Sequence, residues 1–342
     1  MNRSPFAPSP TAAARFPSGW RARLARDPIP NLLREGAPSL SARIRRELID
    51  DDEAPRGSEL LEYADVKAFL KKQGTKGDFP AKPLEKGLGS EKFASVVATV
   101  RALERLAELG LDSGEKAVAL AAEFVLGTQA KDGGIAALAI GETKTDKAKL
   151  PAVHFQGWAL AALCRAGWDS EPRVAAGFNF LLQWRQADGG WAWRGVRSDS
   201  SARPSSHLIT GMALRAFAAS PSRRSSREAR RAAELLATRF LQPDRYPDRK
   251  APTYWEQLAE PRFYVDMLDA LDTVTAVGLG KENSGVRTAE AYVRGRQSSD
   301  GLWYPGAPAE PGAPRIPTVA PKDREAARWL TVRALSVLRR VN

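Results

Sequence analysis

The sequence predicts an all-α fold, an (α/α) toroid in which about five helical hairpins build an inner and an outer ring of helices. Three observations predict it. A helical pattern that ends in Gln recurs five times, its spacing is nearly constant, and each copy contains two segments with helical periodicity. No strand pattern of comparable strength interrupts them.

The repeat is marked by Gln residues, each followed by a turn that is rich in Gly or contains Pro. They are Gln73, Gln129, Gln186, Gln242 and Gln297, separated by 56, 57, 56 and 55 residues. A unit of this length holds two helices and two connections, so the chain is expected to stack similar hairpins side by side.

The first helix of each unit precedes the Gln and carries most of the charged residues. Its apolar residues recur at i, i+3, i+4 and i+7, which is typical of a helix with one buried face. We expect these helices to form the outer ring, at residues 60–73, 115–129, 172–186, 227–242 and 286–297.

The second helix of each unit is richer in Ala, Leu and Val, as expected for an inner ring. Gly110, Gly167 and Gly278 each follow one of these segments, where a chain often leaves a helix through a left-handed residue. The inner helices are predicted at residues 91–109, 154–166, 206–219, 262–277 and 324–341.

Residues 1–56 lie outside the period and are predicted to be an N-terminal extension, partly disordered or packed on the barrel. They begin with a stretch rich in Pro, Ser and Ala, and contain short amphipathic pieces near residues 22–35 and 40–49. The toroid domain is predicted at residues 57–342, with the N-terminal helices available as an irregular sixth unit.

Composition indicates a folded protein of 342 residues with 43% hydrophobic and 27% charged side chains. The net charge is +12, and residues 194–250 alone hold thirteen basic and five acidic side chains. Such a cluster attracts phosphates, polyuronates or an anionic membrane surface, or it is the solvated face of an Arg-rich helix. No nucleic-acid partner is expected.

Cellular location is predicted from absences. A single cysteine, Cys164, excludes an internal disulfide, and there is no run of about 18 apolar residues to form a transmembrane segment. The N-terminus lacks the apolar stretch of a secretion signal. A cytoplasmic protein is therefore expected.

Two of the Gln turns, LLQWRQADGGW and YVRGRQSSDGLW, resemble the QW motif of the squalene cyclase and protein prenyltransferase α/α toroids. The stretches EPRFYVDMLDALDTVTAVG and ARWLTVRALSVLRR are similar to segments of small bacterial toroid proteins described as prenyltransferase-like or squalene-cyclase-like. The resemblance covers roughly residues 57–342. It implies a toroid with a central cavity for an isoprenoid-like apolar ligand.

The chain departs from these families at their reactive groups. The cyclases that this chain resembles carry their catalytic acid in a DxDD motif. The nearest stretch here contains Asp269 and Asp272 but lacks the middle carboxylate. One Cys and two His, none in a matching context, do not supply the zinc ligands of the prenyltransferases. Neither a cofactor nor a metal is expected, and whether the protein is an enzyme stays open.

Candidate catalytic residues stand where inner helices begin, because a toroid opens into its cavity there. His154 and His207 hold equivalent places 53 residues apart, and they suit an acid, a base or a pair of metal ligands. Each is equally suited to cap a helix. Asp266 lies one turn after Arg262, so this pair either orients a ligand or forms an ion pair along the helix.

Candidate substrate-binding residues are aromatic or charged side chains near the same end of the predicted helices. Aromatic faces there would stabilise carbocations or stack on sugar rings, or they would simply fill the core. The set is Phe155, Trp158, Trp193, Trp255, Arg262, Tyr264, Asp323 and Arg324.

Three functions stay open at this point. The first is binding or transformation of an isoprenoid-like ligand. The second is cleavage of an acidic polysaccharide by a lyase or hydrolase, for which Arg194, Arg197, Arg203 and Arg262 lie near the predicted mouth. The third is a non-catalytic toroid whose Arg-rich residues 223–250 bind an acidic partner.

Overall fold

A computed structural model describes residues 19–81, 91–136, 153–192, 205–244, 252–260, 264–306 and 321–342. Twelve α-helices are formed by these residues. Strand structure there is limited to two isolated bridges, Arg185 with Trp191 and Leu258 with Gly306. The predicted all-α class is confirmed.

Five of the six outer helices occur where the charged segments predicted them, although each of the five ends before its Gln, and the first comes from the N-terminal extension. The six are α1 (Ile29–Glu35), α3 (Ala64–Leu70), α5 (Lys116–Leu126), α7 (Pro172–Gln183), α9 (Arg227–Ala237) and α11 (Ser284–Gly295). Helix α3 is shorter than expected, because residues Gly57–Glu62 form a 3-10 helix and Tyr63 is extended. The repeat therefore places the outer helices well and their ends less well.

The inner helices are α2 (Pro38–Leu48), α4 (Glu91–Leu109), α6 (Val153–Arg165), α8 (His207–Ala219), α10 (Met267–Ala276) and α12 (Pro321–Val341). The expected stops after α4, α6 and α10 are confirmed, with positive φ at Gly110, Gly167 and Gly278. Helix α10 begins five residues later than predicted. Asp266 has an extended backbone and caps α10 by accepting a hydrogen bond from the backbone N–H of Asp269.

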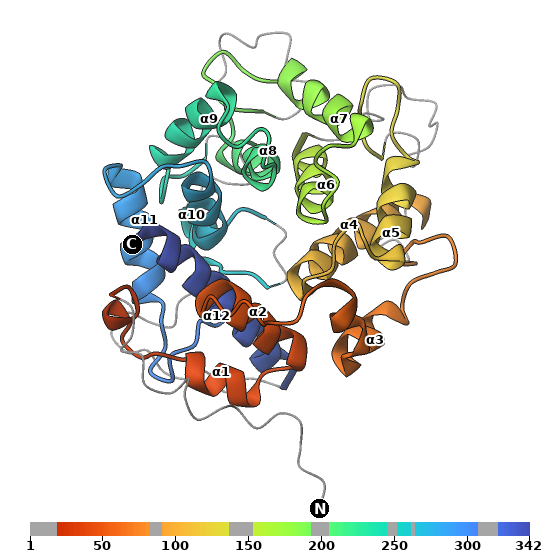
Figure 1. Cartoon of the computed structure of the whole chain (residues 1–342). Helices are drawn as coiled ribbons and strands as arrows, with labels where there is room; N and C mark the ends of the chain where they lie inside the picture. Colours follow the sequence, from red (N-terminus) through yellow and green to blue (C-terminus); the bar gives the residue numbers. More distant parts are fainter. Residues whose placement is uncertain are drawn as a thin grey trace, which may run out of the picture.

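The inner helices form a closed ring of six. Each contacts the next in the order α2, α4, α6, α8, α10 and α12, and α12 contacts α2 again. Figure 1 shows the two concentric rings, with α1 and α3 outside α2. The N-terminal helices thus supply a sixth pair.

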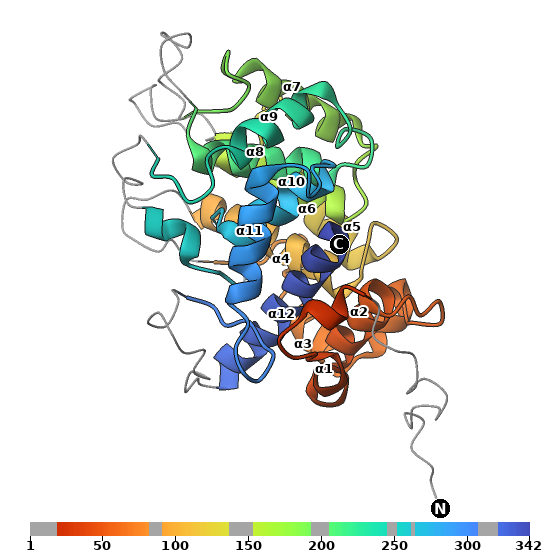
Figure 2. The ribbon, with the colours of Figure 1, turned by 90° about the vertical axis from the view of Figure 1, so that its left-hand side faces the viewer.

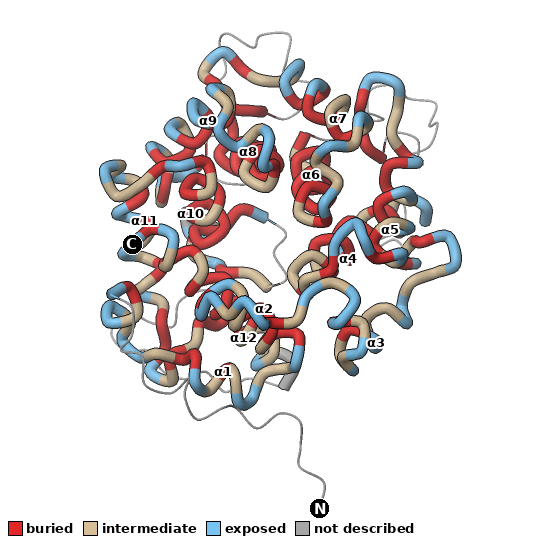
Figure 3. Tube along the Cα trace, viewed as in Figure 1, coloured by how far each residue is buried: buried red, intermediate tan, exposed pale blue. Residues whose placement is uncertain are grey.

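The core lies between the two rings. Figure 3 shows buried residues along the inner helices, and in the side view of Figure 2 α9 and α11 lie outside α8 and α10. The closest helix contact is between α6 and α8. There, a Cβ atom on Gly157 would stand 2.2 Å from the carbonyl oxygen of Met212, so only glycine fits.

The Gln side chains hold neighbouring units together. Nε2 of Gln129 donates to the carbonyl of Gly133 in its own turn (3.0 Å) and to that of Arg173 at the start of the next outer helix (2.8 Å). Gln73 makes the same two bonds, to Gly77 and Ala117. Each Gln therefore joins the turn of its own unit to the first turn of the next outer helix through one side chain.

The third and last units vary this clamp. In the third, Arg185 takes the place of Gln186, donating to the carbonyls of Gly189 (2.9 Å) and Glu228 (3.2 Å). In the last, Gln297 donates to the carbonyl of Gly301 and reaches the backbone of Arg26 ahead of α1. The final clamp therefore joins the end of the ring to its beginning.

No helix among the described residues is both long enough and apolar enough to cross a membrane.

Candidate functional site

A cavity of about 450 Å³ lies at one end of the toroid axis, and all six inner helices contribute to its wall. All lining residues except Arg224, which follows α8, come from the middle or the C-terminal half of an inner helix, so the inner helices run in the same direction. They are Arg43, Glu47, Ala107, Glu108, Arg165, Ala218, Ala219, Arg224, Asp272, Thr273, Ala276, Arg333, Ser336 and Arg340. Eight of these fourteen carry a charge, five of them as Arg.

The described segment at residues 252–260, ahead of α10, brings a carboxylate to two of the inner helices. Its Glu260 carboxylate lies 3.8 Å from Nη1 of Arg105 on α4 and 3.9 Å from Nη1 of Arg333 on α12. The Arg105 guanidinium also stacks 3.6 Å above the ring of Trp329. Ionic and cation–π contacts therefore occupy the middle of the axis.

Below the cavity, Arg215 and Asp269 form an ion pair in which both side chains are fully buried. Nη2 of Arg215 donates to Oδ2 of Asp269 at 2.7 Å. Asp269 is one of the two acids that correspond to the DxDD pattern. The other acid, Asp272, pairs with Arg340 at 2.8 Å. Both carboxylates are thus compensated by guanidinium groups and are poorly placed to donate a proton.

Asp266, a predicted catalytic residue, is buried and holds backbone in place. Its two oxygens accept hydrogen bonds from the N–H groups of Ala259 and Asp269, each at 2.8 Å. Burial raises the pKa of Asp266, and Arg333, 3.9 Å away, opposes that shift. The expected partner Arg262 lies outside the described residues.

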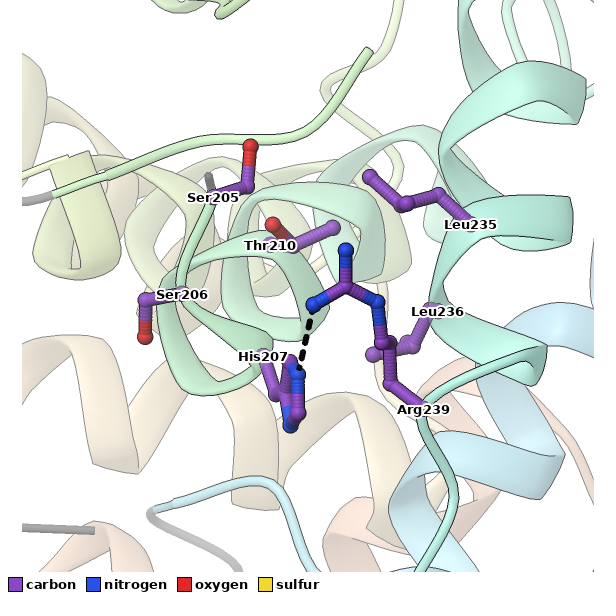
Figure 4. A pocket seen from close by; sticks show the side chains of 7 residues that line it. All are labelled: Ser205, Ser206, His207, Thr210, Leu235, Leu236 and Arg239. Carbon is purple, nitrogen blue, oxygen red and sulfur yellow. Dashed lines mark hydrogen bonds between the residues drawn. The ribbon is translucent and has the colours of Figure 1, made fainter. Parts of the chain in front are cut away.

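His207, the second predicted catalytic residue, is buried between α8 and α9 (Figure 4). Nη1 of Arg239 lies 3.2 Å from its Nε2, and the Tyr254 hydroxyl lies 3.3 Å from its Nδ1. Because arginine only donates, Nε2 accepts and the ring is neutral. Burial lowers the pKa of His207 accordingly. The described side chains leave no room for a water molecule beside it.

His154 lies in the first turn of α6, and burial lowers its pKa to about 4. A neutral imidazole therefore stands at this helix start under physiological conditions. The structure tests neither residue as a catalyst, so both roles stay predictions.

The predicted aromatic residues lie mainly in the core. Phe155 and Trp158 meet edge to face at 6.0 Å, and the Trp158 indole donates to Glu104 at 2.9 Å. Trp255 stacks between Tyr254 (5.0 Å) and His207 (6.0 Å). Tyr264 is 46% exposed. Trp193 lies outside the described residues.

Asp323 and Arg324 stand in the first turn of α12, half-buried and exposed respectively. That turn is far along the helix from the cavity residues Ser336 and Arg340. No predicted site residue within the described part of the chain lines the axial cavity.

The sequence analysis did not predict this cavity, because it placed the site at the N-terminal ends of the inner helices. A signal was present in Arg165 and Asp272, which are charged residues in the largely apolar helices α6 and α10. A buried charge needs a partner, and Glu104 and Arg340 supply one to each.

Metal ligands do not gather in the described part of the chain, which has no group of three His, Cys, Asp or Glu residues able to hold an ion.

No protein-family model and no curated protein matches this chain. Among solved structures, a protein from Actinoplanes is 16% identical with a TM-score of 0.50, over 89% of this chain and 88% of that one. The type II terpene cyclase MstE from Scytonema is 13% identical with a TM-score of 0.34, over 88% and 96%. A variant of MstE bound to its substrate geranylgeranyl dihydroxybenzoate is 14% identical with a TM-score of 0.35, over 89% and 98%. At these identities the likeness shows the fold alone.

Proposed function

We propose that this toroid binds a small polar ligand in the axial cavity, where the inner helices end. The observation that carries the proposal is the wall itself, with eight charged side chains around about 450 Å³. This volume lies within the range of sites for small organic molecules. The six helices of a closed ring hold the wall, so the site is largely preformed.

A hydrocarbon ligand fits this end of the axis poorly. An isoprenoid chain would displace water from guanidinium and carboxylate groups without returning hydrogen bonds, at a cost of several kcal/mol. A sugar, an amino acid or an organic acid offers donors or acceptors to the same groups. The polarity of the wall therefore favours a hydrophilic ligand.

The test is a ligand screen by thermal shift, with a variant that fills the cavity. Ala219→Phe adds bulk to the wall without changing charge, and Ala68→Phe on the exposed side of α3 is the matched control. A polar metabolite should stabilise the wild type and Ala68→Phe but not Ala219→Phe. Equal stabilisation of all three proteins would place the ligand elsewhere.

The isoprenoid-like ligand implied by the resemblance is a second candidate. It is supported by the turn at Gln297, which is one of the two turns on which the resemblance rests and which keeps the Gln clamp. Native mass spectrometry after incubation with geranylgeraniol tests it. A retained adduct or a cyclised product would support this candidate over a hydrophilic ligand.

The two other functions keep their status as expectations. All four arginines proposed to act on an acidic polysaccharide, at residues 194–203 and 262, lie outside the described residues. Three arginines of the region proposed to bind an acidic partner already have partners. Arg223 pairs with Asp169, Arg230 pairs with Glu234, and Arg231 donates to the carbonyl of Ala187.

A further inference from the structure

Arg333 is a buried guanidinium group in the wall of the axial cavity. Its side chain is 2% exposed and Nη2 donates to the carbonyl of Ala259 at 2.8 Å. Within the described part of the chain, Nε and Nη1 have no hydrogen-bond partner. The oxygens of Glu260 and Asp266 come no nearer than 3.9 Å. Two strong donors in the cavity wall are therefore buried and unsatisfied, which is unfavourable unless a bound ligand completes them.

The other charges of the wall are mostly compensated. Four ion pairs do this: Arg43–Glu47 at 2.9 Å, Arg165–Glu104 at 2.7 Å, Arg105–Glu108 at 3.3 Å and Arg340–Asp272 at 2.8 Å. Arg224 is exposed at the rim and has no carboxylate within 4.0 Å among the described residues. Arg224 thus leaves a positive charge at the opening of the cavity, and Arg333 in its wall has carboxylates only at 3.9 Å, too far for a hydrogen bond.

We propose that Arg333 anchors an anionic group of the cavity ligand, a carboxylate or a phosphate, and that Arg224 attracts this group at the rim. The inference rests on the proposed function, since it names the chemical class of the ligand in the same cavity. A guanidinium presents two parallel N–H donors that match two oxygens of either anion. Carboxylate and phosphate share this recognition, so the experiment separates them.

Glu260 and Asp266 fit this role as orienting groups. Both oxygens of Asp266 already accept backbone hydrogen bonds, and Glu260 is shared with Arg105. Neither comes within hydrogen-bond distance of Arg333. The two carboxylates attract the guanidinium from 3.9 Å and leave Nε and Nη1 without a hydrogen bond to any described residue.

Isothermal titration calorimetry at low ionic strength tests the proposal, with inorganic phosphate and malonate as separate probes. Four proteins are compared: wild type, Arg333→Met, Arg333→Lys, and Arg227→Met as a control on the exposed face of α9. The wild type and Arg227→Met should bind at least one probe equally well. Arg333→Met should weaken that binding by about tenfold or more, because it loses charge-assisted hydrogen bonds. Arg333→Lys should fall between, since it keeps the charge and loses the planar fork.

Preference for one probe identifies the anion as carboxylate or phosphate. Failure of the wild type to bind either, or equal binding by Arg333→Met, overturns the inference. If Arg333→Met does not fold, Ala219→Phe decides, because it narrows the cavity without touching a charge and should abolish binding of the probe. A neutral ligand that is lost in Ala219→Phe but kept in Arg333→Met would leave the proposed function standing and remove this inference.

Discussion

At the scale of single residues, one side chain in each of four units reaches both its own turn and the next part of the ring. Arg185 does in the third unit what Gln129 does in the second, reaching a turn carbonyl and the next outer helix. Gln186 makes a single hydrogen bond through its amide nitrogen, to the carbonyl of Trp184 at 3.2 Å. The clamp residue of this unit is therefore shifted by one position from the Gln that marks the repeat.

This shift predicts losses of stability of different size for two adjacent substitutions. Arg185→Ala should lower the free energy of unfolding by about 2 kcal/mol, because two carbonyls lose a charged donor. Gln186→Ala should lower it by less than about 1 kcal/mol. Urea denaturation of both variants measures the difference. A larger loss for Gln186→Ala would restore the Gln as the structural joint.

The two histidines predict a dependence of stability on pH. The pKa of His154 in the folded protein is about 4, below its ordinary value of 6.5. Between these pH values the unfolded chain binds a proton at His154 and the folded chain does not. This contribution is complete above pH 6.5 and is lost as the pH falls toward 4. The lowered pKa of His207 acts in the same direction.

Near pH 5 the loss from His154 is at most about 2 kcal/mol relative to pH 7. Urea denaturation at both pH values should show a smaller loss for His154→Gln than for the wild type. Since other groups also titrate, the comparison between the two proteins is the informative quantity. Identical pH dependence would mean that His154 is protonated as easily in the folded state as in the unfolded chain.

At the scale of elements, apolar periodicity predicted the helices because it depends only on residues that are close together in the sequence. It could not place the start of α10, which a single cap at Asp266 decides. Periodicity also could not predict the charged cavity. Residues such as Arg43, Arg165 and Arg333 are far apart in the sequence, and only the closed ring brings them to one end of the axis.

Contact between α6 and α8 gives a prediction about packing. Gly157→Ala should cost about 2 kcal/mol of stability or more, because its Cβ would overlap the backbone of Met212 and Ala213 and force the helices apart. Gly295, at the end of α11, has no atom near the same added group. Gly295→Ala should leave stability unchanged or raise it by about 0.5 kcal/mol. Melting temperatures of both variants test the contrast, and equal effects would contradict close packing at Gly157.

At the scale of the whole molecule, the ring is closed by the part of the chain that lies outside the repeat. Helix α2 contacts both α4 and α12, and Gln297 donates to the carbonyl of Arg26. In a closed ring each helix pair supports its two neighbours. The N-terminal helices are then expected to unfold together with the rest, not as a separate extension.

Ile44 and Ile49 test this cooperativity, since they lie on or next to α2 and differ in burial. Ile44 is fully buried and Ile49 is 42% exposed. Ile44→Ala should lower the stability of the entire protein by about 3 kcal/mol, and Ile49→Ala should change it by less than about 0.5 kcal/mol. Far-ultraviolet circular dichroism and tryptophan fluorescence should report the same shifted transition for Ile44→Ala. If only a minor early transition moved while the main one stayed in place, residues 1–56 would be an appendage to a ring of five pairs.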